Sequence, residues 1–177
     1  MKKIQFIVFV SALVISAVYF IYTLSFSTGW ALGEDFFQDF YREAQVANKD
    51  MYAWSLRTLV ASGIMLLLNT HKNRKFYIMN FVAVIIVVFL FIYSAIITLN
   101  YIPHIQALYL ELPEAFLRII VAINYSSIST DIFDLGIFLA YIMLLQAVLM
   151  IICTILKTLE QIERDRQIKE LNSGAYK

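Results

Sequence analysis

Few residues in this chain could do chemistry, and they are widely separated. The 177 residues include two histidines and one cysteine. A hydrolase needs a nucleophile, a base and an oxyanion site held together. His71 and His104 are separated by a long apolar segment, which predicts that they lie on opposite sides of a membrane. Cys153 lies inside another apolar segment, and a single cysteine forms neither an intrachain disulfide nor a cysteine-based metal cluster.

Acidic residues do not form a recognisable site either. His104, Glu111 and Glu114 could be imagined as metal ligands, but their spacing does not match HExxH or a comparable zinc motif. Asp131 and Asp134 lie at the margin of an apolar segment, whereas an intramembrane aspartyl protease would need both carboxyl groups deep within such segments. The five glycines are scattered, so no phosphate-binding loop is present. We therefore expect no catalytic residues, no metal and no cofactor.

Small and polar residues inside apolar segments form a second group of candidates. Thr58 and Ser62 are four residues apart, as are Gly136 and Ala140, and this spacing allows two membrane helices to approach closely. Gln146 lies near the middle of its apolar segment. A single amide in lipid most often forms a hydrogen bond between helices, and the alternative is a pore-lining role in an oligomer.

One cation is expected within an apolar segment. Arg57 lies about one and a half turns inside the outer end of its segment, from where its long side chain can reach the headgroups. Asp50 or Asp134 could neutralise it. We take Arg57 and Asp134 as a candidate interfacial ion pair.

These residues must be positioned by apolar helices. Hydrophobic residues make up 61% of the chain and its mean hydropathy is +0.74, against about 45–50% apolar residues in soluble domains. A helix needs about 20 apolar residues to cross the hydrocarbon core, which is about 30 Å thick. The segments that meet this requirement are 4–24, 52–70, 76–99 and 132–156. The sequence thus predicts an all-α protein, a four-transmembrane-helix bundle forming one domain over 1–177, with the lipid bilayer as its solvent.

The connecting segments follow from these spans. Residues 71–75 form a short basic turn and residues 157–177 a charged helical tail, while the outer loops are expected at 25–51 and 100–131. Each outer loop is predicted to hold a short amphipathic helix, near Glu34–Ala47 and near Glu114–Asn124.

The first loop helix carries aromatic side chains on one face, at Phe36, Phe37, Phe40 and Tyr41. These rings could pack on the protein's own bundle, contact lipid or bind another protein, and they are the candidate partner-binding residues. In the second loop, Pro103 and Pro113 are expected to interrupt helical structure, so this loop should not form a further span.

Positive charges predict which side each loop faces. Ten of the basic residues lie on the side of the two termini and four on the side of the long loops, while the acidic residues divide four to nine. Cytoplasmic loops carry the excess of Lys and Arg. Both termini are therefore expected in the cytoplasm, and the Ile-, Phe- and Lys-rich composition suggests a bacterial cell membrane.

The sequence does not specify a biochemical activity. Basic residues occur only in short clusters beside apolar segments, which argues against nucleic-acid binding. The favoured class is a non-catalytic multi-pass membrane protein that acts through protein contacts, as a subunit, assembly factor, adaptor or immunity-type protein. Its partner would be another membrane protein or a second copy of itself. The alternative is a small oligomeric channel or transporter component, although the spans contain few of the polar residues that such proteins need.

Overall fold

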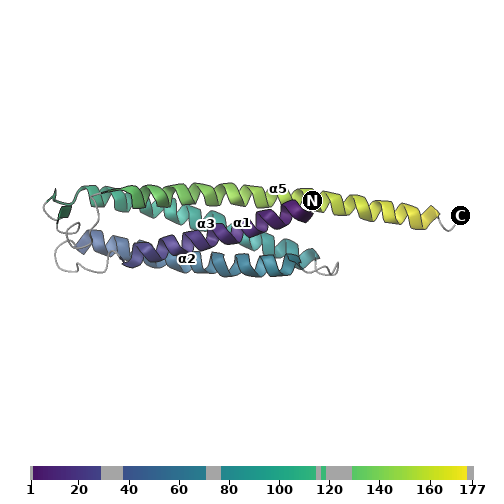
Figure 1. Ribbon diagram of the computed structural model, residues 1–177, viewed down its shortest axis with the longest axis horizontal. Coiled ribbons are helices and arrows are strands. Elements are labelled where there is room, and N and C mark those ends of the chain that lie inside the picture. Colours follow the sequence, from purple (N-terminus) through teal and green to yellow (C-terminus); the bar gives the residue numbers. More distant parts are fainter. Residues whose placement is uncertain (1, 29–37, 71–76, 115–116, 119–128, 175–177) are drawn as a thin grey trace.

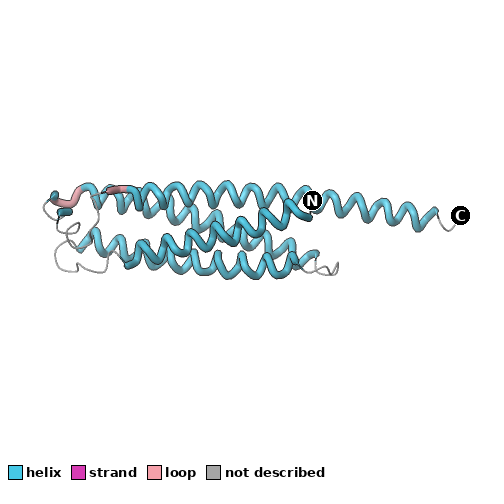
Figure 2. The backbone as a smooth tube through the Cα atoms, viewed as in Figure 1, coloured by secondary structure: helices cyan, strands magenta, loops and turns pink. Residues whose placement is uncertain are grey.

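Four long α-helices account for most of the chain in the computed structural model. The structure describes residues 2–28, 38–70, 77–114, 117–118 and 129–174. The helices are α1 (Lys2–Thr28), α2 (Gln38–Thr70), α3 (Tyr77–Leu110) and α5 (Asp131–Gly174), and Figure 2 shows how little of the described chain is loop. The prediction of an all-α fold is confirmed.

The helices lie side by side in a four-helix bundle, and successive helices run in opposite directions (Figure 1). Helix α1 contacts α2 and α5, and α3 contacts the same two helices. The pairs α1–α3 and α2–α5 are therefore diagonal. A single apolar core, which includes Phe9, Phe91, Phe133 and Met143, runs through all four helices.

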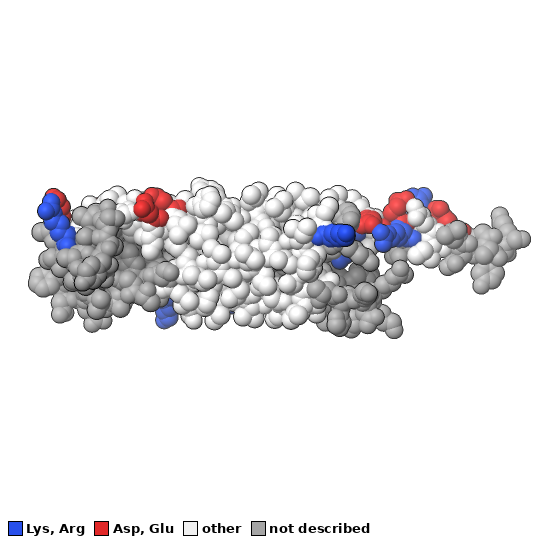
Figure 3. All heavy atoms as spheres, in the orientation of Figure 1, with Lys and Arg blue, Asp and Glu red and all other residues white. Residues whose placement is uncertain are grey.

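The outside of this bundle is largely apolar. Leucine, isoleucine, valine and phenylalanine side chains are exposed along every helix, and Figure 3 shows a broad band without charged residues between two charged ends. On α5 this band runs from Asp134 to Lys157, which at 1.5 Å per residue is about 35 Å and close to the thickness of a hydrocarbon core. All four helices are long and apolar enough to cross a membrane.

Helix α2 begins earlier than the sequence predicts. The amphipathic helix expected near Glu34–Ala47 is not a separate loop element, because α2 runs without interruption from Gln38 to Thr70. Phe40, Ala44, Ala47 and Met51 form one buried stripe along its first turns. Apolar residues at this spacing keep the chain helical and pack it against its neighbours, so from Gln38 onward this segment is continuous with the span that follows it.

Helix α3 likewise continues past the expected end of its span at Leu99. It reaches Leu110 with Pro103 inside it, so this proline does not start a loop. Buried Ile102 and Ile105 flank Pro103, whose own side chain is exposed. Proline is tolerated in membrane helices when packing maintains the helix on both sides of it. Most of the helix expected near Glu114–Asn124 lies outside the described residues.

Gly63 and Gly136, which both lie inside helices, offer a matched test of packing. A Cβ atom added at Gly136 would lie 2.2 Å from Oη of Tyr22 and 2.7 Å from its Cζ, whereas one added at Gly63 would have no atom within 4 Å. We expect Gly136→Ala to lower stability by about 1–3 kcal/mol through overpacking. Gly63→Ala should be neutral or slightly stabilising, because alanine favours helix more than glycine does. Thermal unfolding in detergent checks both variants, and equal losses would contradict the packing argument.

Candidate functional site

The bundle interior contains buried polar side chains, which lipid cannot hydrogen-bond. Those that are at most 3% exposed are Ser16, Thr23, Ser55, Thr58, Ser62, Ser94, Thr98 and Gln146. A polar group buried without a partner in a medium of low polarity costs free energy, so such groups are expected to pair with each other across helices. Most of them do, and the pairs lie in two layers.

The first layer lies toward the end of the bundle where the chain passes from α1 to α2, which is called the outer end below. It is a cluster of hydroxyl groups from three helices. Its hydrogen bonds are Tyr19–Thr98 at 2.6 Å, Thr23–Ser55 at 3.0 Å and Thr58–Ser94 at 3.0 Å. The last two join neighbouring helices, whereas the Tyr19 side chain crosses the bundle from α1 to the diagonal helix α3. The predicted packing residue Thr58 thus contributes a hydrogen bond as well as small size.

The second layer lies nearer the start of α1 and is centred on Gln146. Its Nε2 atom donates a hydrogen bond to the backbone oxygen of Val8 at 2.7 Å, and its Oε1 atom accepts one from Oγ of Ser11 at 3.2 Å. Both ends of the amide are therefore used in holding α5 against α1. This geometry matches the interhelical alternative and leaves the amide little capacity to line a pore.

The other small residues predicted for helix packing also lie inside the bundle. Ser62 and Ala140 are fully buried, and Gly136 is where the Tyr22 ring of α1 meets the backbone of α5. Oγ of Ser62 has no hydrogen-bond partner among the described residues. Tyr19 was not among the sequence candidates, although its spacing of four from Thr23 could have drawn attention to it.

Phe40, one of the aromatic residues predicted to bind a partner, is part of the core. Phe40 is 3% exposed, and its ring lies 6.2 Å from that of Tyr109, which in turn lies 5.4 Å from Phe133. Phe40 is thus unavailable to another protein, and its packing on the protein's own bundle explains why an apolar residue stands there. Phe36 and Phe37 lie outside the described residues, and nothing is described of the side chain of Tyr41.

The proposed ion pair between Arg57 and Asp134 is absent. These residues lie on α2 and α5, which are diagonal in the bundle and do not contact each other. The guanidinium group of Arg57 instead lies over the ring of Trp54, 4.4 Å from its centroid. Asp134 accepts hydrogen bonds from Gln106 at 3.4 Å and from Thr130 at 3.3 Å.

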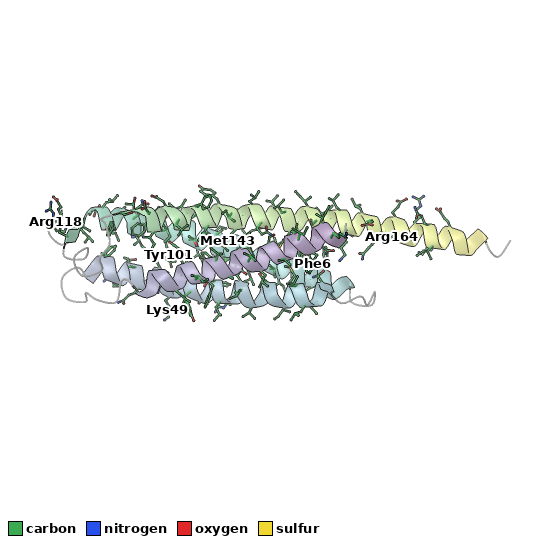
Figure 4. All side chains as sticks on the ribbon, in the orientation of Figure 1. Phe6, Lys49, Tyr101, Arg118, Met143 and Arg164 are labelled. Carbon is green, nitrogen blue, oxygen red and sulfur yellow. The ribbon has the colours of Figure 1, made fainter. Side chains whose placement is uncertain are left out.

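The second carboxylate considered for Arg57 is also engaged elsewhere. Asp50 accepts a hydrogen bond of 2.9 Å from Oη of Tyr101, which joins α2 to α3 at the outer end. Figure 4 shows Tyr101 at the same end of the bundle as Lys49. With this bond and the one from Gln106 to Asp134, each neighbouring pair of helices has at least one side-chain hydrogen bond.

Within the described residues, no three His, Cys, Asp or Glu side chains come together in a way that could hold a metal ion. Comparison with protein-family models, curated proteins and solved structures finds no match.

The burial of Phe40 leads to a specific expectation. Phe40→Ser should lower the stability of the bundle by about 3 kcal/mol or more, because a large ring is removed from a packed site. Exposed Val46 on the same helix provides the control, since Val46→Ser removes an apolar side chain without opening the core. Thermal unfolding of both variants in detergent measures the difference. An unchanged melting temperature for Phe40→Ser would contradict the packing described here.

Proposed function

We propose that this protein is a non-catalytic component of a cell-membrane complex and acts through protein contacts at the ends of its bundle. The observation that carries the proposal is the closed interior. Large side chains fill the centre, including Phe9, Phe91 and Met143. The polar groups there mostly bond to one another, and none of the buried residues described is Asp, Glu, Lys or Arg.

A closed interior argues against transport through one chain. Channels and transporters keep charged or clustered polar groups facing a water-filled cavity, or break their helices near the midplane. Here Gln146 bonds to α1, and the hydroxyl groups of Thr58 and Ser94 bond to each other. These groups hold the helices together and are not free to replace the hydration shell of an ion.

The outer end offers surface for a protein partner. Leu110 is 64% exposed there, and Val46 on α2 is also exposed. Charged side chains lie nearby in sequence, including Glu111 and the exposed pair of Glu114 and Arg118, which is joined at 2.7 Å. A mixture of exposed apolar and charged groups is typical of contact surfaces between proteins.

We further propose that both termini face the cytoplasm. The bundle places the two ends of the chain away from the outer loops, with the N-terminus beside the point where α5 leaves the bundle (Figure 1). Most of the basic residues belong to that side, at the termini and in residues 71–75. The positive-inside rule supports this orientation.

The proposal predicts loss of a partner when the outer end is altered. A triple variant with Phe36→Ser, Phe37→Ser and Leu110→Ser should lose most of a protein that co-purifies with the wild type in gentle detergent, because its apolar contacts are removed. Leu67→Ser is the matched control, since Leu67 is 71% exposed but lies near the opposite end of α2. Quantitative mass spectrometry of the purified samples measures the partner. Equal recovery from the triple variant and the control would contradict the proposal.

The closed interior also predicts the outcome of a transport assay. Liposomes containing the purified protein should show ion flux no greater than empty liposomes, because large apolar side chains fill the core between the described helices. Gln146→Leu should behave in the same way, since the amide serves only to bond α5 to α1. Flux above the empty-liposome level that is altered by Gln146→Leu would instead favour the channel alternative.

A further inference from the structure

Helix α5 extends well beyond the rest of the bundle. After Lys157 it continues as an uninterrupted helix to Gly174, and Figure 1 shows no other helix beside this part. Figure 4 places Arg164 on it, far from the outer end marked by Arg118. The aliphatic residues Leu159 and Ile162 are 58% and 61% exposed.

This part of α5 lacks the packing against other helices from which most helical stability in proteins comes. The extension contains ion pairs four residues apart, between Arg164 and Glu160 and between Arg166 and Glu170. Such pairs contribute only about 0.2–0.5 kcal/mol each, and they do not explain why two aliphatic side chains face water. A partner that covers Leu159 and Ile162 would account for both features.

These two residues continue a longer pattern on α5. Exposed apolar residues recur along it at alternating spacings of three and four, which is the spacing of the a and d positions of a heptad repeat. We call this set the α5 seam, and its residues are Phe138, Tyr141, Leu145, Val148, Ile152, Ile155, Leu159 and Ile162. The next two positions of the repeat are Arg166 and Lys169, so the apolar part of the seam ends at Ile162.

Contact with lipid explains the first part of the seam but not its end. At 1.5 Å per residue, Leu159 and Ile162 lie about 37 Å and 42 Å along the helix from Asp134, beyond a hydrocarbon core of about 30 Å. A helix lying on the membrane surface usually has a cationic polar face that attracts anionic headgroups. The extension lacks this excess, because its charges cancel: the basic residues are Lys157, Arg164, Arg166 and Lys169, and the acidic ones are Glu160, Glu163, Asp165 and Glu170.

We propose that the α5 seam is the interface between two copies of this chain, packed with their α5 helices parallel. Two copies inserted in the membrane in the same orientation have parallel α5 helices, and equivalent residues of the two helices lie at the same depth along the membrane normal. Each seam residue then meets its own counterpart across a twofold axis, as in other symmetric dimers. A net charge of zero on the extension avoids long-range repulsion between the copies. The extension then forms a short coiled coil that continues the contact beyond the membrane.

Cysteine cross-linking in native membranes tests this geometry. In a Cys153→Ala background, Leu159→Cys and Ile162→Cys should form disulfide-linked dimers on mild oxidation, because each introduced thiol faces its counterpart. Gln161→Cys and Arg164→Cys lie on the same exposed helix but outside the seam, and they should give at least fivefold less dimer. Equal cross-linking at all four positions, or none at the seam positions, would overturn the proposal.

A second measurement does not depend on cysteine chemistry. The double variant Leu159→Glu with Ile162→Glu should shift the purified protein from dimer to monomer, as counted by single-molecule photobleaching in sparsely loaded liposomes. Gln161→Glu with Gln167→Glu adds the same charge outside the seam and should leave the dimer intact. A monomeric wild type, or equal dimer fractions in the two variants, would overturn the proposal. Only the purified chain is used, so the result is independent of any partner at the outer end.

Discussion

The structure depends on one constraint: hydrogen-bonding groups inside a bundle surrounded by apolar side chains must find partners within the protein. The backbone meets this constraint by forming helices, which satisfy their own N–H and C=O groups. The side chains meet it by pairing across helices, as Tyr19 does with Thr98 and Gln146 with the backbone of Val8. Apolar attraction alone would not fix how these helices pair, because their outward faces are equally apolar. Hydrogen bonds between neighbouring helices, such as Thr23–Ser55 and Thr58–Ser94, therefore help to specify which helices are adjacent and their relative axial positions.

The same pairing limits what the interior can do. A polar group that is already bonded to a neighbouring helix can bind a ligand only if that contact breaks. The hydroxyl groups of Thr58 and Ser94 form a hydrogen bond with each other. The amide of Gln146 forms hydrogen bonds through both its nitrogen and its oxygen. These bonds support the proposal that the ends of the bundle, and not its interior, make the functional contacts. At one end the helices α2 and α3 carry exposed residues beside charged ones, and at the other the extension of α5 leaves the bundle entirely.

Burial separates residues that look alike in the sequence. Phe40 and Leu110 are both large, apolar and near the predicted outer loops, yet the first is in the core and the second is exposed. Both lie in helices, because α2 begins at Gln38 and α3 continues to Leu110, but Phe40 is on the face that packs into the core and Leu110 is on an exposed face. Arg57 provides a similar case, since its partner is the ring of Trp54 on its own helix and not a carboxylate on a diagonal helix.

The helical class and the four apolar segments could be predicted from composition and segment length, because a helix in lipid must be apolar over a fixed distance. The helix ends could not, since Pro103 carries a local signal of helix interruption that packing against neighbouring helices overrides. Nor could the sequence show that the helix predicted near Glu34–Ala47 joins the span 52–70, which α2 makes continuous from Gln38. Small and polar candidates such as Gly136 and Gln146 could be recognised one at a time from their position within a span. Their partners could not, because the contact of Gly136 with Tyr22 and that of Gln146 with Val8 join residues more than one hundred positions apart. Such contacts exist only once the order of helices around the bundle is set.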